Sequence, residues 1–270
     1  MTARQVAFIV TAMLIFSVKT VCQQATTLDY VKLINAVNLF SKSSVFILTP
    51  QGGGTGTLFT VPFSDTSKSG FTYLATAKHV LNKTDSTGKI IGRYDTVSVD
   101  LNLTRGSKES RKYEWMLLSK DLDIAILHPI EFHRPFADYD VVAPDLSMVA
   151  TFAQLRKGQL AFLSGYPYGV GTQGSKLDPV IQSGMVAFVD TLHSLVLLDI
   201  PVNHGNSGCP VFVVTDSAQV KLLGLVFEYQ PSTQDYVFSV AAKKMVPANT
   251  SLGRVLMISS LVGDLYKLRH

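Results

Sequence analysis

The sequence has little cysteine and little charge. Two of its 270 residues are cysteine, and 16% are charged against 47% hydrophobic. A disulfide framework is therefore excluded, and so is a long disordered chain, which would be polar and strongly charged. Its 19 glycines and 11 prolines exclude collagen-like and low-complexity chains. The net charge of +4 is not gathered into a basic run, so nucleic acid is not an expected partner.

Residues 1–22 have the pattern of a signal peptide. Arg4 gives a basic start, and Val6–Val18 form a mostly apolar run of thirteen residues. A membrane-spanning helix needs about 20 residues, so this run has the length of a signal core. We expect cleavage after Cys22, with Ala25 as the second choice, and secretion to the extracellular space or periplasm without stable membrane insertion. The alternative is an uncleaved anchor, which the short run and the lysine at its end disfavour.

Cleavage after Cys22 would leave Cys209 as the one remaining cysteine. An unpaired cysteine in an exported chain is either a buried, inert thiol or a reactive one, and we favour burial because Cys209 lies inside an apolar motif. Asn82, Asn102 and Asn249 begin Asn-x-Ser/Thr sequons, which matter only if the cell glycosylates secreted proteins.

The chain after the signal segment begins with an amphipathic pattern and then changes period. Residues 28–40 repeat apolar side chains every three or four positions, which predicts a short helix within 23–43. Runs of β-branched and aromatic residues between turn residues then predict six strands: Ser44–Thr49, Thr55–Val61, Phe71–Thr76, Thr96–Leu101, Arg111–Leu118 and Ile124–His128.

A second series of strands follows a proline-containing linker at 129–150. The predicted strands are Gln159–Ser164, Val180–Val189, His193–Ile200, Pro210–Thr215, Val220–Phe227 and Asp235–Ala241. Residues 251–268 have helical spacing, which predicts a helix within 248–270. The pattern therefore indicates an all-β protein of two packed six-stranded antiparallel barrels, at 44–150 with the linker and at 151–247, flanked by short N- and C-terminal helices.

Three segments could carry chemistry together. His79 follows an apolar strand, Asp123 stands at the start of another, and Ser207 lies between glycines in Asn203-His-Gly-Asn-Ser-Gly-Cys-Pro210. Each alone is weak, since a loop histidine, a turn aspartate and a tight Gly-Asn-Ser-Gly turn are common structural features. A serine nucleophile, however, needs a base within hydrogen-bond reach, and imidazole oriented by a carboxylate supplies it. Glycine at position 205 would let the N–H groups of Gly205 and Ser207 converge on an oxyanion.

Several motifs of this chain resemble those of chymotrypsin-like (trypsin-like) serine peptidases, particularly the HtrA-type protease domain. The resemblance covers about residues 44–242 in the same order, through these segments: Gly54–Phe59, Ala75–Val80, Asp123–Leu127, Gly165–Gly169 with Gln182–Val186, and Val202–Pro210. The order His, Asp, Ser is theirs and differs from that of α/β-hydrolases. The resemblance implies the chymotrypsin-like double barrel, without a PDZ domain after residue 245.

The resemblance also implies residue roles. Ser207 would be the nucleophile, His79 the general base and acid, and Asp123 its orienting acid, with Asp121 as the nearest rival to Asp123. Gly205 and Ser207 would form the oxyanion hole, and Val202 would line an apolar specificity pocket for small or aliphatic side chains. The implied function is a secreted serine endopeptidase acting on protein or peptide substrates through an acyl-enzyme, with no metal or other cofactor.

Two departures and two alternatives remain. Cys209 replaces the second glycine after the serine, and Asn206 stands where digestive relatives carry the Asp that pairs with a new N-terminus. Activation by N-terminal insertion is therefore not expected. The intact set of three residue types argues against a catalytically inactive binding protein with the same fold, and an esterase using the same triad is the third option. Histidine spacing disfavours zinc. Gly169–Gly174 fits a dinucleotide motif but lacks the helix that should follow.

Overall fold

The computed structural model describes residues 30–64, 67, 69–119, 122–239 and 244–261. The predicted signal peptide at 1–22 lies outside these residues. An α-helix occupies residues 30–41, inside the predicted 23–43 segment, of which residues 23–29 are also outside the described part. Among the described residues, no helix combines the length and the apolar character that crossing a bilayer requires.

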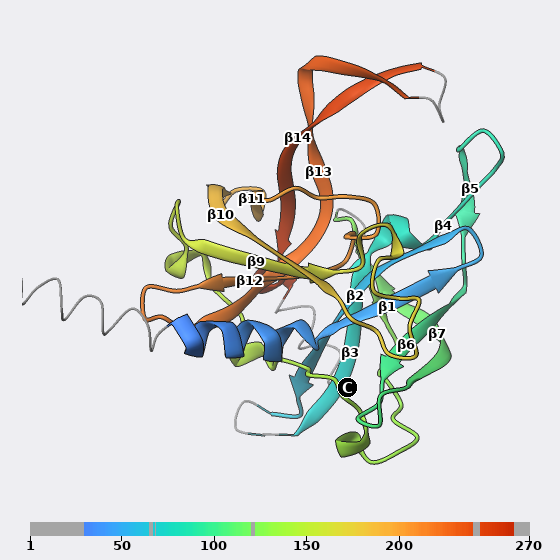
Figure 1. Ribbon diagram of the computed structural model, residues 1–270, viewed down its shortest axis with the longest axis vertical. Helices are drawn as coiled ribbons and strands as arrows, with labels where there is room; N and C mark the ends of the chain where they lie inside the picture. The colour runs from blue at the N-terminus through green and yellow to red at the C-terminus, as the bar shows by residue number, and fades with distance from the viewer. Residues whose placement is uncertain (1–29, 65–66, 68, 120–121, 240–243, 262–270) are drawn as a thin grey trace, which may run out of the picture. The chain divides into compact units, whose positions relative to one another are not determined.

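Six strands of the first half close into an antiparallel barrel in the order β1-β2-β3-β8-β7-β6 (Figure 1). Their bounds are β1 (Ser44–Thr49), β2 (Gly52–Pro62), β3 (Gly70–Ala77), β6 (Thr96–Asn102), β7 (Lys108–Leu118) and β8 (Ile124–Leu127). Between β3 and β6 in the sequence, β4 (Asn82–Thr84) and β5 (Ile90–Arg93) form a separate two-stranded hairpin.

Six strands of the second half close in the order β10-β11-β14-β13-β12-β9. Their bounds are β9 (Leu160–Gly165), β10 (Val180–Asp190), β11 (Leu195–Asp199), β12 (Pro210–Val214), β13 (Val220–Ser239) and β14 (Lys244–Met257). Short 3-10 turns lie at η1 (Lys78–Leu81), η2 (Phe136–Asp138), η3 (Leu146–Met148), η4 (Phe152–Gln154), η5 (Pro167–Gly169) and η6 (Ile258–Leu261). The predicted pair of six-stranded antiparallel barrels is confirmed.

Each barrel has its own apolar core. In the first, Ile47, Leu58 and Leu74 are fully buried with the other inward side chains of their strands. In the second, Leu163 and Val255 are buried in the same way. Burying one such side chain contributes about 1.5–3 kcal/mol relative to leaving it exposed, so each barrel is stabilised by its own apolar core.

The predicted C-terminal helix is wrong for residues 251–257. This segment is part of β14, which pairs with β11 through Val196↔Val255 and with β13 through Val226↔Val255. Val255 and Met257 face the second core on alternate positions, and a short apolar run fits a helix or a strand equally well by spacing alone. The predicted strand Asp235–Ala241 is correspondingly not separate, because β13 runs on to Ser239. Residues 262–270 lie outside the described part.

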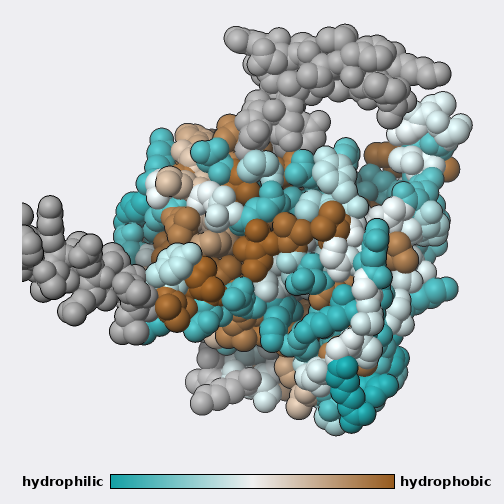
Figure 2. All heavy atoms as spheres, in the orientation of Figure 1, coloured by the Kyte–Doolittle hydropathy of each residue, from teal (hydrophilic) through white to brown (hydrophobic). Residues whose placement is uncertain are grey.

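The outer face of β10 carries three exposed apolar side chains. Ile181 and Met185 are exposed there, and a bulge after Val186 shifts the register so that Phe188 is exposed as well. β10 crosses the face seen in Figure 1, and Figure 2 shows apolar residues gathered across that face. The inward side of the same strand supplies Val186 to the second core.

Candidate active site

Strand pairing brings His79 and Asp123 together. β3 and β8 are antiparallel with Ala77 opposite Ile124, so the residues just beyond those two positions are neighbours. His79 lies two residues after Ala77 in η1, and Asp123 directly precedes Ile124. Nδ1 of His79 lies 2.5 Å from Oδ2 of Asp123, and the His79 backbone N–H donates to Oδ1 at 3.0 Å. The carboxylate therefore holds both the ring and the backbone of the histidine.

Ser207 reaches the same histidine from the second barrel. It lies on the loop between β11 and β12, and its Oγ is 2.8 Å from Nε2 of His79. The three residues singled out in the sequence thus form one continuous hydrogen-bonded chain from hydroxyl to imidazole to carboxylate. The rival Asp121 lies outside the described residues.

Lys78, which sequence reasoning missed, supports the segment that carries the acid. Its Nζ donates to the carbonyl oxygens of Ser119 and Leu122, each at 3.0 Å. Its backbone N–H also donates to the carbonyl of Asp123 at 3.2 Å. The signal available in the sequence was a charged residue, Lys78, between the apolar end of the strand and His79.

Two glycines of the nucleophile loop have conformations that other residues rarely adopt. Gly205 has φ +95° and Gly208 has φ +86°. A Cβ at Gly205 would lie 2.2 Å from the carbonyl oxygen of Tyr166, and one at Gly208 would lie 2.0 Å from that of Thr55. Both positions require glycine for conformation and for space, as the sequence pattern around Ser207 suggested.

Some backbone N–H groups of this loop donate hydrogen bonds within the protein, and others do not. Those of Asn206, Gly208 and Cys209 donate to backbone carbonyls at 2.7–3.0 Å. Within the part of the chain that the structure describes, no hydrogen bond to protein is made by the N–H of Gly205 or Ser207. Two free donors on either side of Asn206 are what an oxyanion would need.

Threonines of the first barrel hold the loop of the second. The hydroxyl of Thr55 accepts from the N–H of Tyr166 at 3.1 Å and donates to the carbonyl of Gly205 at 2.7 Å. Its backbone N–H donates to the carbonyl of Ser207 at 3.0 Å, and Thr57 donates to the carbonyl of Gly208 at 2.9 Å. The sequence showed these residues only as part of a glycine-rich strand.

The two other singled-out residues of the second barrel are buried. Val202 is 3% exposed and belongs to the second core. It packs so closely on Gly253 that a Cβ there would lie 2.6 Å from the Val202 side chain. Its role in specificity stays a prediction. Cys209 is fully buried, and burial raises the pKa of its thiol well above the ordinary range. Cys209 therefore has the character of the inert, packed thiol that the sequence favoured.

A cleft of about 730 Å³ opens from Ser207 and His79. Its lining mixes apolar and polar side chains, and it contains no Asp, Glu, Lys or Arg. The larger lining residues are Phe46, Leu48, Gln51, Val80, Ile90, Tyr168 and His204. Tyr168 is a non-glycine residue at φ 52°, and its hydroxyl donates to Oδ1 of Asn203 at 3.3 Å. A left-handed tyrosine at a cleft edge is strained backbone of the kind that occurs at functional sites.

Gln51 fixes the far wall of this cleft. Its side-chain amide accepts from the N–H of Thr84 at 2.7 Å and donates to the carbonyl of Thr84 at 2.5 Å. The turn between β1 and β2 is thereby tied to the β4–β5 hairpin, which carries Ile90.

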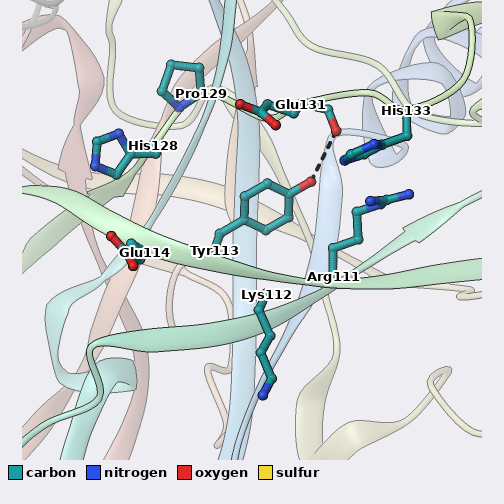
Figure 3. A pocket seen from close by; sticks show the side chains of 8 residues that line it. All are labelled: Arg111, Lys112, Tyr113, Glu114, His128, Pro129, Glu131 and His133. Atoms are coloured by element: carbon teal, nitrogen blue, oxygen red, sulfur yellow. Dashed lines mark hydrogen bonds between the residues drawn. The ribbon is translucent and has the colours of Figure 1, made fainter.

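A second hollow, of about 530 Å³, lies on the first barrel away from these residues (Figure 3). Its floor is Tyr113, whose pKa burial raises to about 12. Arg111 at its rim is paired with Glu109, which also binds Arg134. The hollow contains no activated nucleophile, and no group of three or more metal-ligating side chains is found among the described residues.

Comparisons with known proteins agree with the double-barrel fold. Three solved structures share the fold: Deg5 (21% identity, 84% of this chain and 90% of that chain, TM-score 0.52), the MamO protease domain from Magnetospirillum magneticum (14%, 84% and 97%, 0.50) and a serine endoprotease from Yersinia pestis (17%, 88% and 66%, 0.51). At these identities the likeness concerns the fold. No curated protein sequence gives a significant match.

The family model named "Trypsin-like peptidase domain" matches residues 54–225, which is more than half of the chain. This stretch begins at the β2 glycines beside the nucleophile loop and includes His79, Asp123 and Ser207. The chain therefore belongs to the trypsin-like peptidase domain family.

Proposed function

We propose that this chain is a serine endopeptidase in which Ser207 is the nucleophile, His79 the general base and acid, and Asp123 the orienting acid. The observation that carries the proposal is the hydrogen-bonded chain from Ser207 through His79 to Asp123, in a member of a peptidase family. A binding protein would gain nothing from this arrangement, because only acyl transfer needs a hydroxyl activated by an oriented imidazole.

Acylation starts when Oγ of Ser207 attacks the carbonyl carbon of the peptide bond. Nε2 of His79 takes the hydroxyl proton, and the electron pair of the C=O bond moves onto its oxygen. The free N–H groups of Gly205 and Ser207 stabilise that oxyanion. When the C–N bond breaks, the imidazolium of His79 gives its proton to the leaving amine, and the acyl-enzyme remains on Ser207.

Deacylation repeats these steps with water. His79 takes a proton from the water as the water oxygen attacks the ester carbon. When the C–Oγ bond of the second tetrahedral intermediate breaks, the imidazolium of His79 returns the proton to Oγ of Ser207. Asp123 keeps the ring oriented and its carboxylate stabilises the imidazolium. None of these steps requires a metal or an organic cofactor.

Two regions set the substrate preference in this proposal. Val202, on the acyl side, selects small or aliphatic residues. The cleft beside His79 receives the residues after the scissile bond, because the leaving amine must lie at Nε2 to accept its proton. Protein and peptide substrates with a small or aliphatic residue before the bond and an uncharged residue after it are therefore favoured. The signal pattern at 1–22 supports export of the enzyme.

A fluorophosphonate probe combined with a random peptide library tests the proposal. The wild-type protein should be labelled once per chain and should cleave peptides, and labelling should vanish in Ser207→Ala. An exposed serine of the same barrel, in Ser183→Ala, serves as the matched control and should leave labelling intact.

The other outcomes each overturn the proposal. Absence of labelling in the folded wild-type protein would show a binding protein. Labelling with turnover of simple esters but no peptide cleavage would show an esterase. Cleavage dominated by Lys or Arg before the bond would overturn the role of Val202.

A further inference from the structure

The side chain between the two free N–H donors is buried and held at one end only. Asn206 is 0% exposed, and its Nδ2 donates to Oε1 of Gln182 at 3.0 Å. Its Oδ1 has no hydrogen-bond partner among the described residues. A buried amide normally satisfies both ends, so the single bond to Gln182 is what fixes the orientation of this side chain.

Gln182 also binds the residue that precedes Val202. It extends from β10, and its Nε2 donates to the carbonyl of Pro201 at 2.9 Å. One amide thus bridges two parts of the segment between β11 and β12: the residue before Val202 and the residue before Ser207. Both bonds use neutral groups, which do not titrate in the range where the protein is folded.

The orientation of Asn206 matters because its backbone links the two free donors. The N–H of Gly205 precedes this residue in the chain and the N–H of Ser207 follows it. Rotation of the Asn206 backbone would turn the peptide plane that carries the N–H of Ser207, and would so change the orientation of this donor relative to the N–H of Gly205. Without Gln182, both ends of a buried amide would lack partners, and the loop would rearrange to bring that amide to water or to another carbonyl.

We propose that Gln182 is a positioning residue that keeps the nucleophile loop in its oxyanion-binding form by acting through Asn206. Gln182 is absent from the residues that line the cleft, so it acts at a distance from the reacting atoms. The proposal rests on the peptidase function proposed above. The side-chain amide of Gln182 on β10 orders the loop that carries Ser207, and the peptidase function depends on that loop.

Gln182→Met tests this role, because methionine has similar length and no comparable hydrogen-bonding groups. The kcat for a short ester substrate should fall about 10- to 100-fold, less than the roughly 10²–10³-fold cost of removing a whole oxyanion donor, while KM changes less than about threefold. Ile181→Met on the outer face of the same strand is the matched control and should keep wild-type kcat.

Gln182→Glu gives a signature that a general loss of packing would not. At neutral pH its carboxylate still accepts from Asn206 but faces the carbonyl of Pro201 without a proton to donate. Protonation restores that donor. The ratio of Gln182→Glu to wild-type activity, measured at each pH, should therefore rise as the pH falls toward about 4.3, the ordinary pKa of Glu.

Hydrogen exchange of residues 203–209 separates this proposal from the proposed function. Exchange in this loop should rise in Gln182→Met and stay at the wild-type rate in Ile181→Met, whether or not the protein is active. Unchanged loop exchange, or a raised KM with unchanged kcat, would overturn the positioning role. Raised exchange in a protein that no fluorophosphonate labels would keep the positioning role and reject the peptidase.

Discussion

In the first barrel, His79 and Asp123 are brought together by the pairing of β3 with β8, whereas Ser207 in the second barrel lies on a loop that side chains hold. In the first barrel, backbone hydrogen bonds between strands set the arrangement, and many core side chains together fix the register of those strands. The arrangement in the second barrel depends on single hydroxyl and amide groups from β2 and β10. We therefore expect the position of Ser207 to be more sensitive to single side-chain substitutions in its supporting residues than the positions of His79 and Asp123 are.

A first-barrel substitution that removes chemistry and leaves structure intact should have the largest effect. We expect Asp123→Asn to lower kcat/KM by about 10⁴, because the amide stabilises the wrong imidazole tautomer. Peptide hydrolysis measures this, with circular dichroism to show the retained fold. Exposed Asp199 of the second barrel supplies the control, Asp199→Asn, which should be silent. A loss below about tenfold in Asp123→Asn would remove Asp123 from the triad and reopen the case for Asp121.

A substitution in β2 should disturb the second barrel's loop more than its own barrel. Thr55→Val removes the hydroxyl that bridges Tyr166 and Gly205. Loss of two buried hydrogen bonds, each worth about 0.5–1.5 kcal/mol, predicts a decrease in kcat/KM of roughly 5- to 150-fold if the loss falls on the loop geometry that the reaction needs. Thr60→Val, on the same strand but bonded to Ala143, is the control and should change activity less than about twofold. Equal effects of the two variants would contradict the difference between the barrels.

The hairpin of the first barrel should alter selectivity with a smaller effect on rate. Ile90 lines the cleft, whereas its neighbour Ile91 is exposed outside it. Ile90→Asp should lower kcat/KM about 5- to 10-fold for peptides with leucine after the scissile bond, and should improve those with lysine there. Ile91→Asp, the matched control, should preserve the wild-type preference. If both variants behave alike, the leaving group does not lie in this cleft.

The smallest effect is expected at the buried thiol. Because burial raises the pKa of Cys209, its reactive thiolate is scarce at pH 8, and the site is closed to reagents. Iodoacetamide should leave the folded protein unmodified and fully active, and should modify it once urea unfolds the chain. Mass spectrometry follows the modification. Rapid alkylation of native protein would show that the second barrel opens around Cys209.

Local patterns in the sequence predicted most strands of the two barrels but not the β4–β5 hairpin, and the motif order predicted which residues approach one another. The two strands that position His79 and Asp123 have such a local basis, because β3 ends two residues before His79 and β8 begins directly after Asp123. The bonds from Thr55 and Gln182 to the nucleophile loop do not, since they join positions far apart in the chain and any polar residue fits a strand locally. The segment 251–257 was mistaken for helix because only closure of the barrel, which needs a sixth strand, decides its conformation.

The bonds from Thr55 and Thr57 have one more consequence. They cross from one barrel to the other beside Ser207, so any motion that parts the barrels breaks the loop supports and the His79–Ser207 contact in the same event. Heat or denaturant that separates the barrels would therefore dismantle the proposed catalytic set even where each apolar core stays folded.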